Sequence, residues 1–244
     1  PLPAPRPWQA GERISQPIQA LSASGLNTFE STGSCGDFWV HRVPFANTTV
    51  TSLHGKTKLE LLENSALRAV CRMTCTMDIP RGLNEARSRR LDVTDPVDVV
   101  STITVTRGSK RIDFVTEVDW HEDHRMLKAY FPVDVRSTKA TYDIQCGHVE
   151  RPTHYNTSWD YARFEVCAHK WADLSDDSYG VSLLNNCKYG HSIYGNEMQI
   201  TLLKSPKEPD YAADMGKHGF TYSLLPHSGR VTDGGTIPES HFLN

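Results

Sequence analysis

Apolar and polar side chains alternate along two neighbouring stretches of the sequence, residues 111–120 and 127–135. The even-numbered positions of the first stretch are Ile112, Phe114, Thr116, Val118 and Trp120. The odd-numbered positions of the second stretch are Leu127, Ala129, Phe131, Val133 and Val135. A two-residue period is typical of a strand that buries one face, so both stretches predict β-strands.

A hairpin is expected just before the first of these strands. Apolar positions alternate over 99–107, and Gly108-Ser109 provides a turn that leads the chain back into 111–120. The stretch 59–73 predicts a second hairpin. Further strands are predicted at residues 38–40, 47–53, 180–184, 197–203 and 219–225. No segment keeps a helical apolar period, so the predicted fold class is all-β, a large antiparallel β-sandwich.

Composition divides the chain into three parts. Residues 1–36 are rich in proline, glycine and serine and predict an arm or linker, while residues 37–229 form the expected β-sandwich domain. Residues 230–244 are polar and glycine-rich, which predicts a flexible tail. The four arginines of residues 81–90 are not accompanied by a pattern of apolar residues that could be buried, so this stretch is expected to be a solvated loop.

A polar loop rich in aromatic residues follows the second alternating strand. The loop spans residues 150–161 and carries His154, Tyr155, Asn156, Trp159 and Asp160. Arg163 follows it two positions after its end. Such side chains are costly to order unless they bind a ligand or brace a neighbour. Tyr155 and Trp159 offer apolar faces for stacking on a sugar ring. The Asn156 amide, the Asp160 carboxylate and the Arg163 guanidinium offer hydrogen-bond partners for its hydroxyls. Trp159 is equally well explained as an anchor at a domain interface.

A second candidate cluster combines two loops that are expected to meet at one rim of the sheet. It consists of Lys188 and Tyr189 in the first loop and Lys204 in the second. Both lysines and the tyrosine are suited to contact sugar hydroxyls. Lys204 is equally well explained as a lysine without a binding role at the end of a strand, beside Pro206.

Charge and cysteine usage exclude several classes of partner. The chain has 26 basic and 29 acidic residues, a net charge of -3, which gives no electrostatic case for binding nucleic acid or an acidic membrane. No apolar run approaches the length of a bilayer, so a soluble chain is expected. The six cysteines are scattered, which favours free thiols in a reducing compartment. The proline-rich start lacks methionine and is not a signal peptide, which suggests a fragment or a processed product.

Neither a catalytic residue nor a metal ligand is expected in this chain. His121 and His124 are three positions apart at a strand corner, where they would point to opposite faces, and Cys71 and Cys75 lack a second cysteine pair. The sequence contains neither a nucleophile-elbow motif nor a glycine-rich phosphate loop. Carboxylates near the polar loop, Glu165 among them, are expected to lie on the surface by default.

Several collinear segments resemble one known family. They read EVDWHEDHRMLKAYFPVDVRS, GHVERPTHYNTSWDYARFEVCAHKWADLS, GVSLLNNCKYG and LLKSP. Over about residues 59–229 the sequence is similar to the β-sandwich region of class II α-mannosidases, the zinc-dependent glycoside hydrolases of family 38, in their cytosolic and vacuolar branch. The resemblance implies a galactose-mutarotase-like supersandwich. It also implies that the nucleophilic aspartate and the ligands of zinc (or cobalt) lie on a separate α/β-barrel, outside this chain.

The same resemblance gives the expected function. The chain would be the non-catalytic portion of a retaining α-mannosidase, packed on the barrel, with a basic residue at Lys204 near the pocket for a mannose-containing oligosaccharide. A stand-alone sandwich that binds carbohydrate or protein without turnover, and a truncated product without activity, are the alternatives. The expected location is the cytoplasm or the vacuole or lysosome. Whether copies of the chain associate is left open.

Overall fold

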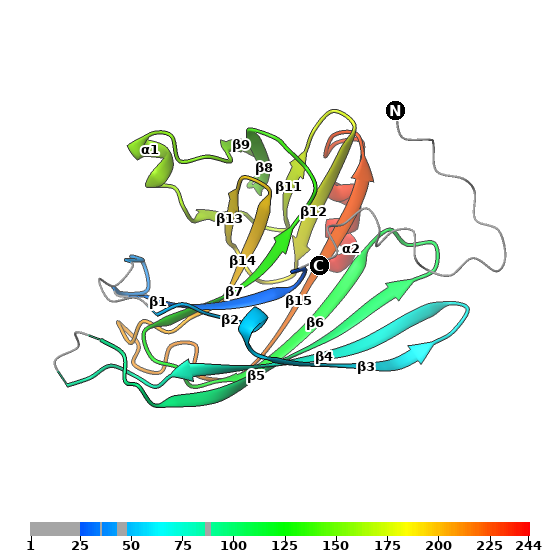
Figure 1. Cartoon of the computed structure of the whole chain (residues 1–244). Coiled ribbons are helices and arrows are strands. Elements are labelled where there is room, and N and C mark those ends of the chain that lie inside the picture. The colour runs from blue at the N-terminus through cyan, green and yellow to red at the C-terminus, as the bar shows by residue number, and fades with distance from the viewer. Residues whose placement is uncertain (1–24, 35, 43–47, 86–88) are drawn as a thin grey trace.

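The computed structural model describes residues 25–34, 36–42, 48–85 and 89–244. Within these ranges the chain folds into two antiparallel β-sheets, one of six strands and one of nine. The two sheets pack against each other with apolar side chains between them (Figure 1). The predicted fold class, an all-β antiparallel sandwich, is therefore confirmed.

The smaller sheet has the strand order β10-β13-β14-β7-β1-β2. Its strands are β1 (Thr28–Gly33), β2 (Val50–Thr51), β7 (Arg125–Pro132), β10 (Val166–Cys167), β13 (Gly190–Tyr194) and β14 (Glu197–Lys204). All neighbouring strands are antiparallel. The strand predicted at 127–135 corresponds to β7, which begins two positions earlier and ends at Pro132.

The larger sheet has the strand order β3-β4-β5-β6-β15-β12-β11-β8-β9. Its strands are β3 (Lys56–Asn64), β4 (Arg68–Pro80), β5 (Thr94–Thr106), β6 (Ile112–Trp120), β8 (Lys139–Ile144), β9 (Gly147–Pro152), β11 (Trp171–Ser175), β12 (Tyr179–Asn185) and β15 (Gly216–Ser228). The strands predicted at 180–184, 197–203 and 219–225 are confirmed as β12, β14 and β15. Each of the three is longer than predicted.

The predicted hairpin before residue 111 is present as β5 and β6. The two strands pair antiparallel, with Val105 opposite Ile112, and residues 107–111 form the turn between them. Gly108 has a φ of 82° in this turn, a left-handed conformation that favours glycine. Every predicted inward position of β6 is buried: Ile112, Phe114, Thr116, Val118 and Trp120. The two-residue period therefore identified the correct face of the strand.

Three aromatic rings join the two sheets inside the core. The ring centroid of Phe114 lies 5.5 Å from that of Phe131 and 5.4 Å from that of Tyr222. The Tyr222 hydroxyl donates to Asn27 Oδ1 over 2.7 Å and lies 2.8 Å from Thr116 Oγ1, so this buried polar group has its partners. Burial of each large apolar side chain stabilises the fold by about 1.5–3 kcal/mol.

Part of the arm predicted at residues 1–36 is in fact a strand. β1 pairs with β7 along its whole length, and Phe29 and Ser31 point inward and are buried. Phe29 is the only large apolar residue of β1, so its inward face gives no visible alternation in the sequence. The first 24 residues of the predicted arm lie outside the described residues.

The strand predicted at residues 38–40 is wrong, because this stretch forms an irregular turn. Asp37 Oδ1 accepts hydrogen bonds from the backbone N–H groups of Trp39 (2.9 Å) and Val40 (2.7 Å). A side chain that binds nearby backbone donors in this way competes with strand pairing. The sequence pattern of alternating size and polarity does not reveal this competition.

The strand predicted at residues 47–53 is confirmed only in part. Residue 47 lies outside the described residues, and β2 is the only strand within the rest of this stretch. The 3-10 helix η1 (Ser52–His54) follows β2 directly. The side chain of Ser52 accepts a hydrogen bond from the backbone N–H of Phe29 over 3.0 Å, which ties this turn to β1.

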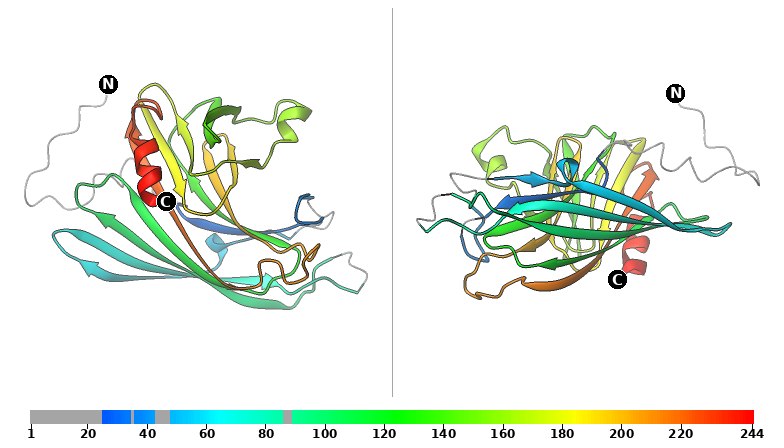
Figure 2. Two further views of the ribbon diagram at one scale, coloured as in Figure 1. Left: turned by 180° about the vertical axis from the view of Figure 1, so that it is seen from behind. Right: turned by 60° about the horizontal axis from the view of Figure 1, so that its bottom comes forward.

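The β3–β4 hairpin extends the larger sheet past the end of the smaller one (Figures 1 and 2). In its register Leu59 pairs with Met73 and Leu61 with Cys71, and paired residues point to the same face of a sheet. Met73 belongs to the core, yet Leu59 and Leu61 are 65% and 66% exposed. The apolar inner face of the larger sheet therefore continues into solvent at this end.

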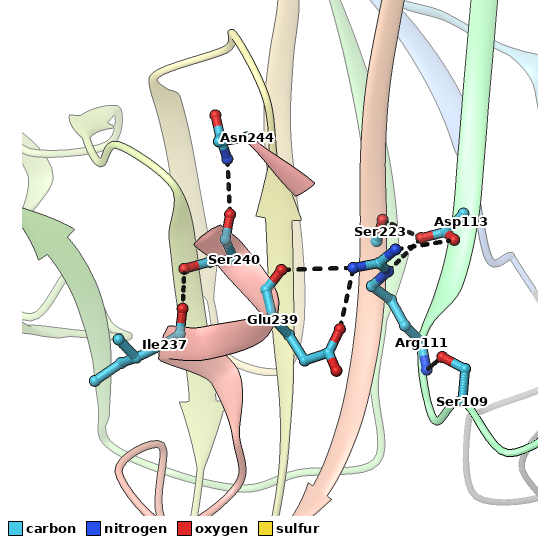
Figure 3. Close-up of polar contacts among 8 residues, drawn as sticks. All are labelled: Ser109, Arg111, Asp113, Ser223, Ile237, Glu239, Ser240 and Asn244. Carbon is cyan, nitrogen blue, oxygen red and sulfur yellow. Dashed lines mark hydrogen bonds and ion pairs between the residues drawn. The ribbon is translucent and has the colours of Figure 1, made fainter. Parts of the chain in front are cut away.

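The flexible tail predicted at residues 230–244 is wrong, because helix α2 (Thr236–Leu243) occupies most of it. A small second core of Trp171, Leu184, Leu225 and Val231, with Leu243, lies between the helix region and the sheet. Figure 3 shows Arg111 reaching from the start of β6 to α2, where its guanidinium donates to the Glu239 carboxylate over 3.0 Å. The apolar residues of α2 do not gather on one side, so the sequence lacks a helical period there.

A buried polar cluster also fixes α2 to the sheet. The Asp173 carboxylate lies 2.7 Å from His227 Nε2 and accepts hydrogen bonds from Ser182 (2.6 Å) and Ser175 (2.7 Å). The Ser182 hydroxyl also lies 2.6 Å from the hydroxyl of Thr236, the first residue of α2. The carboxylate, and not the imidazole, stands at the centre of this cluster, so it lacks the order of a Ser-His-Asp triad. Its role is structural.

Candidate functional site

The predicted polar loop at residues 150–161 is shorter than expected and contains a helical turn. Its first residues end strand β9, and α1 (Ser158–Tyr161) forms near its end. Thr157 and Asp160 form a capping box: Asp160 N donates to Thr157 Oγ1, and Thr157 N donates to Asp160 Oδ2, each over 3.1 Å. Asp160 is therefore engaged in ordering the segment.

Tyr155 also braces this segment. Its ring stacks on Tyr194 at a centroid distance of 4.6 Å, and Tyr161 packs edge-on at 6.0 Å. The hydroxyl of Tyr155 lies 3.5 Å from Ser192 Oγ. Tyr155 and Arg163 both line a cavity of about 10 Å³, room for one water molecule. One face of the Tyr155 ring is thus already covered by protein.

Three of the predicted site residues in this segment are open to solvent. Asn156 and Arg163 are exposed, and Trp159 on α1 is 75% exposed. In Figures 1 and 2, α1 and the loops that follow β1 and β14 lie at one end of the molecule, and the β3–β4 hairpin lies at the other. The accessible members of the predicted set therefore share one end of the sandwich.

The two loops of the second predicted cluster are linked through β15. Lys188 Nζ lies 4.7 Å from the ring centroid of Phe220, and the ring of His218 stacks on the same phenylalanine at 6.0 Å. His218 Nε2 is 3.1 Å from the carbonyl oxygen of Asp214. The Asp214 carboxylate in turn accepts the backbone N–H of Lys204 over 2.8 Å. A continuous chain of contacts thus connects Lys188 with Lys204.

Tyr189 and Lys204 differ in how much of each side chain is free. Tyr189 is 54% exposed and packs edge-on against His169 at 5.4 Å. Lys204 is half-buried, and its Nζ donates to the carbonyl oxygens of Phe38 (3.3 Å) and Val40 (3.2 Å). Burial lowers the pKa of the Lys204 ammonium group below its ordinary value. The ammonium group of Lys204 is thus used largely inside the protein.

An ion pair on the outer face of the smaller sheet was not among the site residues predicted from the sequence. Glu165, just before β10, pairs with Lys128 on β7 and accepts a hydrogen bond from Thr201 on β14. A Cβ atom at Gly190 would lie 2.9 Å from Glu165 Oε1, so glycine leaves room for the carboxylate. Lys128 is only 8% exposed. Glu165 is therefore not the freely solvated carboxylate expected, and the outward position of Lys128 gave no signal of burial.

His41 and Phe164 connect this ion pair with the loop that follows β1. Their ring centroids are 5.4 Å apart, and His41 Nδ1 lies 2.8 Å from Ser34 Oγ. Burial, together with the nearby charges of Lys128 and Lys204, lowers the pKa of His41. The neutral imidazole is thus favoured here. Residues from β7, β14 and the loops after β1 and α1 meet on the outer face of one sheet.

The two histidines of the β6–β7 corner have separate partners. His121 Nε2 lies 2.8 Å from Asp119 Oδ1, and His124 Nδ1 lies 3.1 Å from Asp123 Oδ1. In the part of the chain that the structure describes, no group of three or more histidine, cysteine or acidic residues is placed to hold a metal ion. The residues of this corner therefore do not fit a zinc site.

The arginine-rich stretch at residues 81–90 is not simply a solvated loop. Arg90 is 6% exposed, and its guanidinium donates to the carbonyl oxygens of Asp123 (2.6 Å) and His124 (2.5 Å). Arg81 forms an exposed ion pair with Asp95 on β5. Residues 86–88 lie outside the described part. One arginine thus closes the β6–β7 corner, a contact across 33 residues that composition alone does not predict.

The fold and this site define a two-sheet β-sandwich domain with polar and aromatic residues gathered at one end and on the outer face of its smaller sheet. The family model described as the glycosyl hydrolases family 38 C-terminal domain matches residues 17–212. The chain belongs to this family. Among the residues described, no helix is long and apolar enough to cross a membrane.

Three curated relatives are α-mannosidases by name. The chain is 42% identical over 220 residues to alpha-mannosidase G of Dictyostelium discoideum, which covers 90% of this chain and 19% of that protein. It is 56% identical over 137 residues to alpha-mannosidase 2C1 of Homo sapiens, covering 56% of this chain and 13% of the relative. It is 44% identical over 158 residues to alpha-mannosidase of Saccharomyces cerevisiae, covering 64% of this chain and 14% of the relative. The chain thus spans less than a fifth of the length of each of these relatives.

The fold is also similar to a solved structure. The crystal structure of an alpha-mannosidase from Enterococcus faecalis V583 superimposes with a TM-score of 0.80 at 18% identity. The match covers 88% of this chain and 27% of that one. At this identity the likeness establishes the sandwich fold.

Proposed function

We propose that this chain is the C-terminal β-sandwich part of a retaining α-mannosidase that releases terminal α-mannose from oligosaccharides. The observation that supports this most directly is the family match over residues 17–212, together with relatives at 42–56% identity that are named α-mannosidases. In this proposal the catalytic groups belong to a barrel domain of the same enzyme. The sandwich packs on that domain and contributes one wall of the sugar pocket.

The wall is proposed to be the end of the sandwich that carries α1 and Lys204. Asn156, Trp159 and Arg163 are exposed there and offer an amide, an indole face and a guanidinium to a sugar. Residues that already brace the protein would hold the wall in place, and these are Tyr155, Asp160, Lys188, Tyr189 and Lys204. A preorganised wall of this kind loses little entropy when a ligand binds.

Packing on another domain is supported by apolar surface that this chain leaves open. Leu59 and Leu61 extend the inner face of the larger sheet into solvent, and Trp159 is 75% exposed at the other end. Exposed apolar groups of this size commonly mark interaction surfaces. A catalytic barrel of the same enzyme is the partner we propose for the sandwich.

The zinc (or cobalt) of the proposed enzyme is assigned to the barrel, because the described residues of this chain offer no fitting set of ligands. In this proposal none of the described residues takes part in a step through a metal. Its residues bind and orient the sugar and limit the access of water. The five cysteines that the structure describes are free thiols, which supports the cytoplasm as the location, with the vacuole or lysosome as the other proposed site.

The proposal is tested with a full-length protein that contains this sequence. It is expected to hydrolyse an aryl α-mannoside with retention of configuration and to lose activity when treated with a chelator. The 244-residue chain alone is expected to show no turnover, with or without added zinc or cobalt. A full-length protein that binds mannosides but releases no mannose would overturn the proposal in favour of a binding module.

A further inference from the structure

We propose that the turn at residues 36–41 is a carbohydrate-stacking subsite in which Trp39 contacts a mannose ring and Lys204 positions the turn. This inference rests on the proposed function for its ligand class. Trp39 was not among the site residues predicted from the sequence. Trp39 is 77% exposed, about as much as Trp159.

The turn is built from contacts at both of its ends. The Asp37 carboxylate accepts the backbone N–H groups of Trp39 and Val40. Gly36 has a φ of 120°, and a Cβ atom there would lie 2.4 Å from the carbonyl oxygen of Val40. Only glycine fits such a close approach of two backbone segments. The sequence is therefore locally adapted to this shape.

Neighbouring elements hold the turn from outside. The backbone N–H of Phe38 donates to the carbonyl oxygen of Glu208 over 3.0 Å, which joins the turn to the loop after β14. Lys204 Nζ donates to two carbonyl oxygens of the turn, those of Phe38 and Val40. At the far end, His41 packs against Phe164. Because the Lys204 ammonium group donates to backbone oxygens of the turn, Lys204 would affect a bound ligand by holding the turn in place.

A braced turn is an unusual place for open apolar side chains. Phe38, Trp39 and Val40 are 47%, 77% and 42% exposed. Three consecutive exposed apolar residues are unfavourable in water unless they have a function. Because the backbone of the turn is already fixed by hydrogen bonds, a ring that stacks on the Trp39 indole does not have to order the backbone first, which favours binding.

The surroundings favour a sugar over a protein as the occupant. Asp37 and His41 belong to the turn, and the Lys204 ammonium group donates to its carbonyl oxygens, so charged and polar groups lie close to the apolar side chains. A pyranose ring has one apolar face and a rim of hydroxyls, which matches this combination. A stable protein interface buries about 800 Å² on each side and is depleted of charge at its centre, which a single turn flanked by ions does not provide.

The test uses the indole N–H signals of the 244-residue chain in NMR spectra, with methyl α-mannoside and α-mannobiose as probes. The Trp39 signal is identified by its absence in Trp39→Phe. It is expected to shift saturably with sugar, and Trp39→Ala should weaken mannobiose binding by about tenfold, the loss of one aromatic contact. The matched control is Phe242→Ala on α2, an aromatic residue that is 79% exposed and should change nothing.

The role of Lys204 is tested in the same spectra. Lys204→Met should abolish the sugar-induced shift of Trp39, and Lys204→Arg should restore part of it because a guanidinium can still donate to two carbonyls. The signal of Trp120, whose indole N–H donates to Ser205 in the core, reports whether each variant is folded. An unchanged sugar response in folded Lys204→Met would show that the lysine does not position the turn.

Two outcomes overturn the subsite itself. One is a Trp39 signal that does not respond to either sugar. The other is a full-length enzyme in which Trp39→Ala lowers the melting temperature but leaves KM for mannobiose unchanged, which would make the turn a contact between domains. In that second case the enzyme still hydrolyses mannosides, so the proposed function survives. If the Trp39 signal responds to sugar but the full-length protein has no turnover, the subsite stands and the proposed function fails.

Discussion

His191 makes the stability of this fold depend on pH in a predictable direction. The residue lies on β13 opposite Ile200 and is completely buried, and its Nε2 lies 3.4 Å from Asn185 Nδ2. Burial lowers its pKa to about 4, against the opposing effect of the Glu165 carboxylate. In the unfolded chain the imidazole has its ordinary pKa of about 6.5.

The sign of the effect follows from these two values. As the pH falls below about 6.5, the unfolded chain takes up a proton at this position before the folded chain does, so acid favours unfolding. The stabilisation is complete above the unfolded pKa and is lost as the pH falls towards about 4. At about 1.4 kcal/mol per pH unit, the loss between pH 7 and pH 4 is about 3 kcal/mol. A typical domain has only about 5–15 kcal/mol of stability in total.

The assay is urea unfolding of the wild-type chain and of His191→Gln at pH 7, 5.5 and 4. Glutamine cannot titrate, so the free energy of unfolding of the variant should fall by about 3 kcal/mol less than that of the wild type over this range. The control is His121→Gln, since the His121 side chain is 69% exposed. If wild type and His191→Gln lose the same stability between pH 7 and pH 4, His191 is not buried as a neutral imidazole and the reasoning is wrong.

Other predictions test the packing beneath α2 and two glycines within strands β12 and β15 of the larger sheet. Gly180→Ala should lower the free energy of unfolding by about 1–3 kcal/mol, because its Cβ would lie 2.5 Å from His227, whereas Gly219→Ala, with open space around the Cβ, should change it far less. Equal melting temperatures for these two variants would contradict the close packing. Asp173→Ala should cost about 3–5 kcal/mol in chemical unfolding, because it leaves the buried polar groups around it unpaired. Arg111→Ala, which removes partly exposed ion pairs, should cost at most about 1 kcal/mol in the same measurement, and a larger loss than for Asp173→Ala would reverse this ranking.

Much of the fold could be predicted from the sequence because its signal is local. The alternation in β6 reflects which side chains of one strand meet the core, and it requires no knowledge of partners. Where a strand has few large apolar residues, as in β1, the same reasoning fails although the strand pairs fully with β7. Helix α2 was missed for a related reason. Its stability comes from contacts with distant segments, such as Thr236 with Ser182, 54 positions apart, and Leu243 with the small second core, and not from an apolar period of its own.

The site is harder to predict because its parts are joined by contacts between distant segments. Lys204 reaches the carbonyl oxygen of Val40 across 164 positions, and this contact changes its role from a free basic group to a support for the turn. Residue type alone identified Trp159 and Lys204 as suited to a sugar, but it could not show which side chains the protein uses internally. Trp39 lies in the stretch 38–40, for which the sequence predicts a strand, and a single exposed aromatic residue in a strand needs no explanation. Its exposure becomes significant only once the turn is known to be held from several sides, since an ordered apolar tip in water is a feature that folding by itself would not favour.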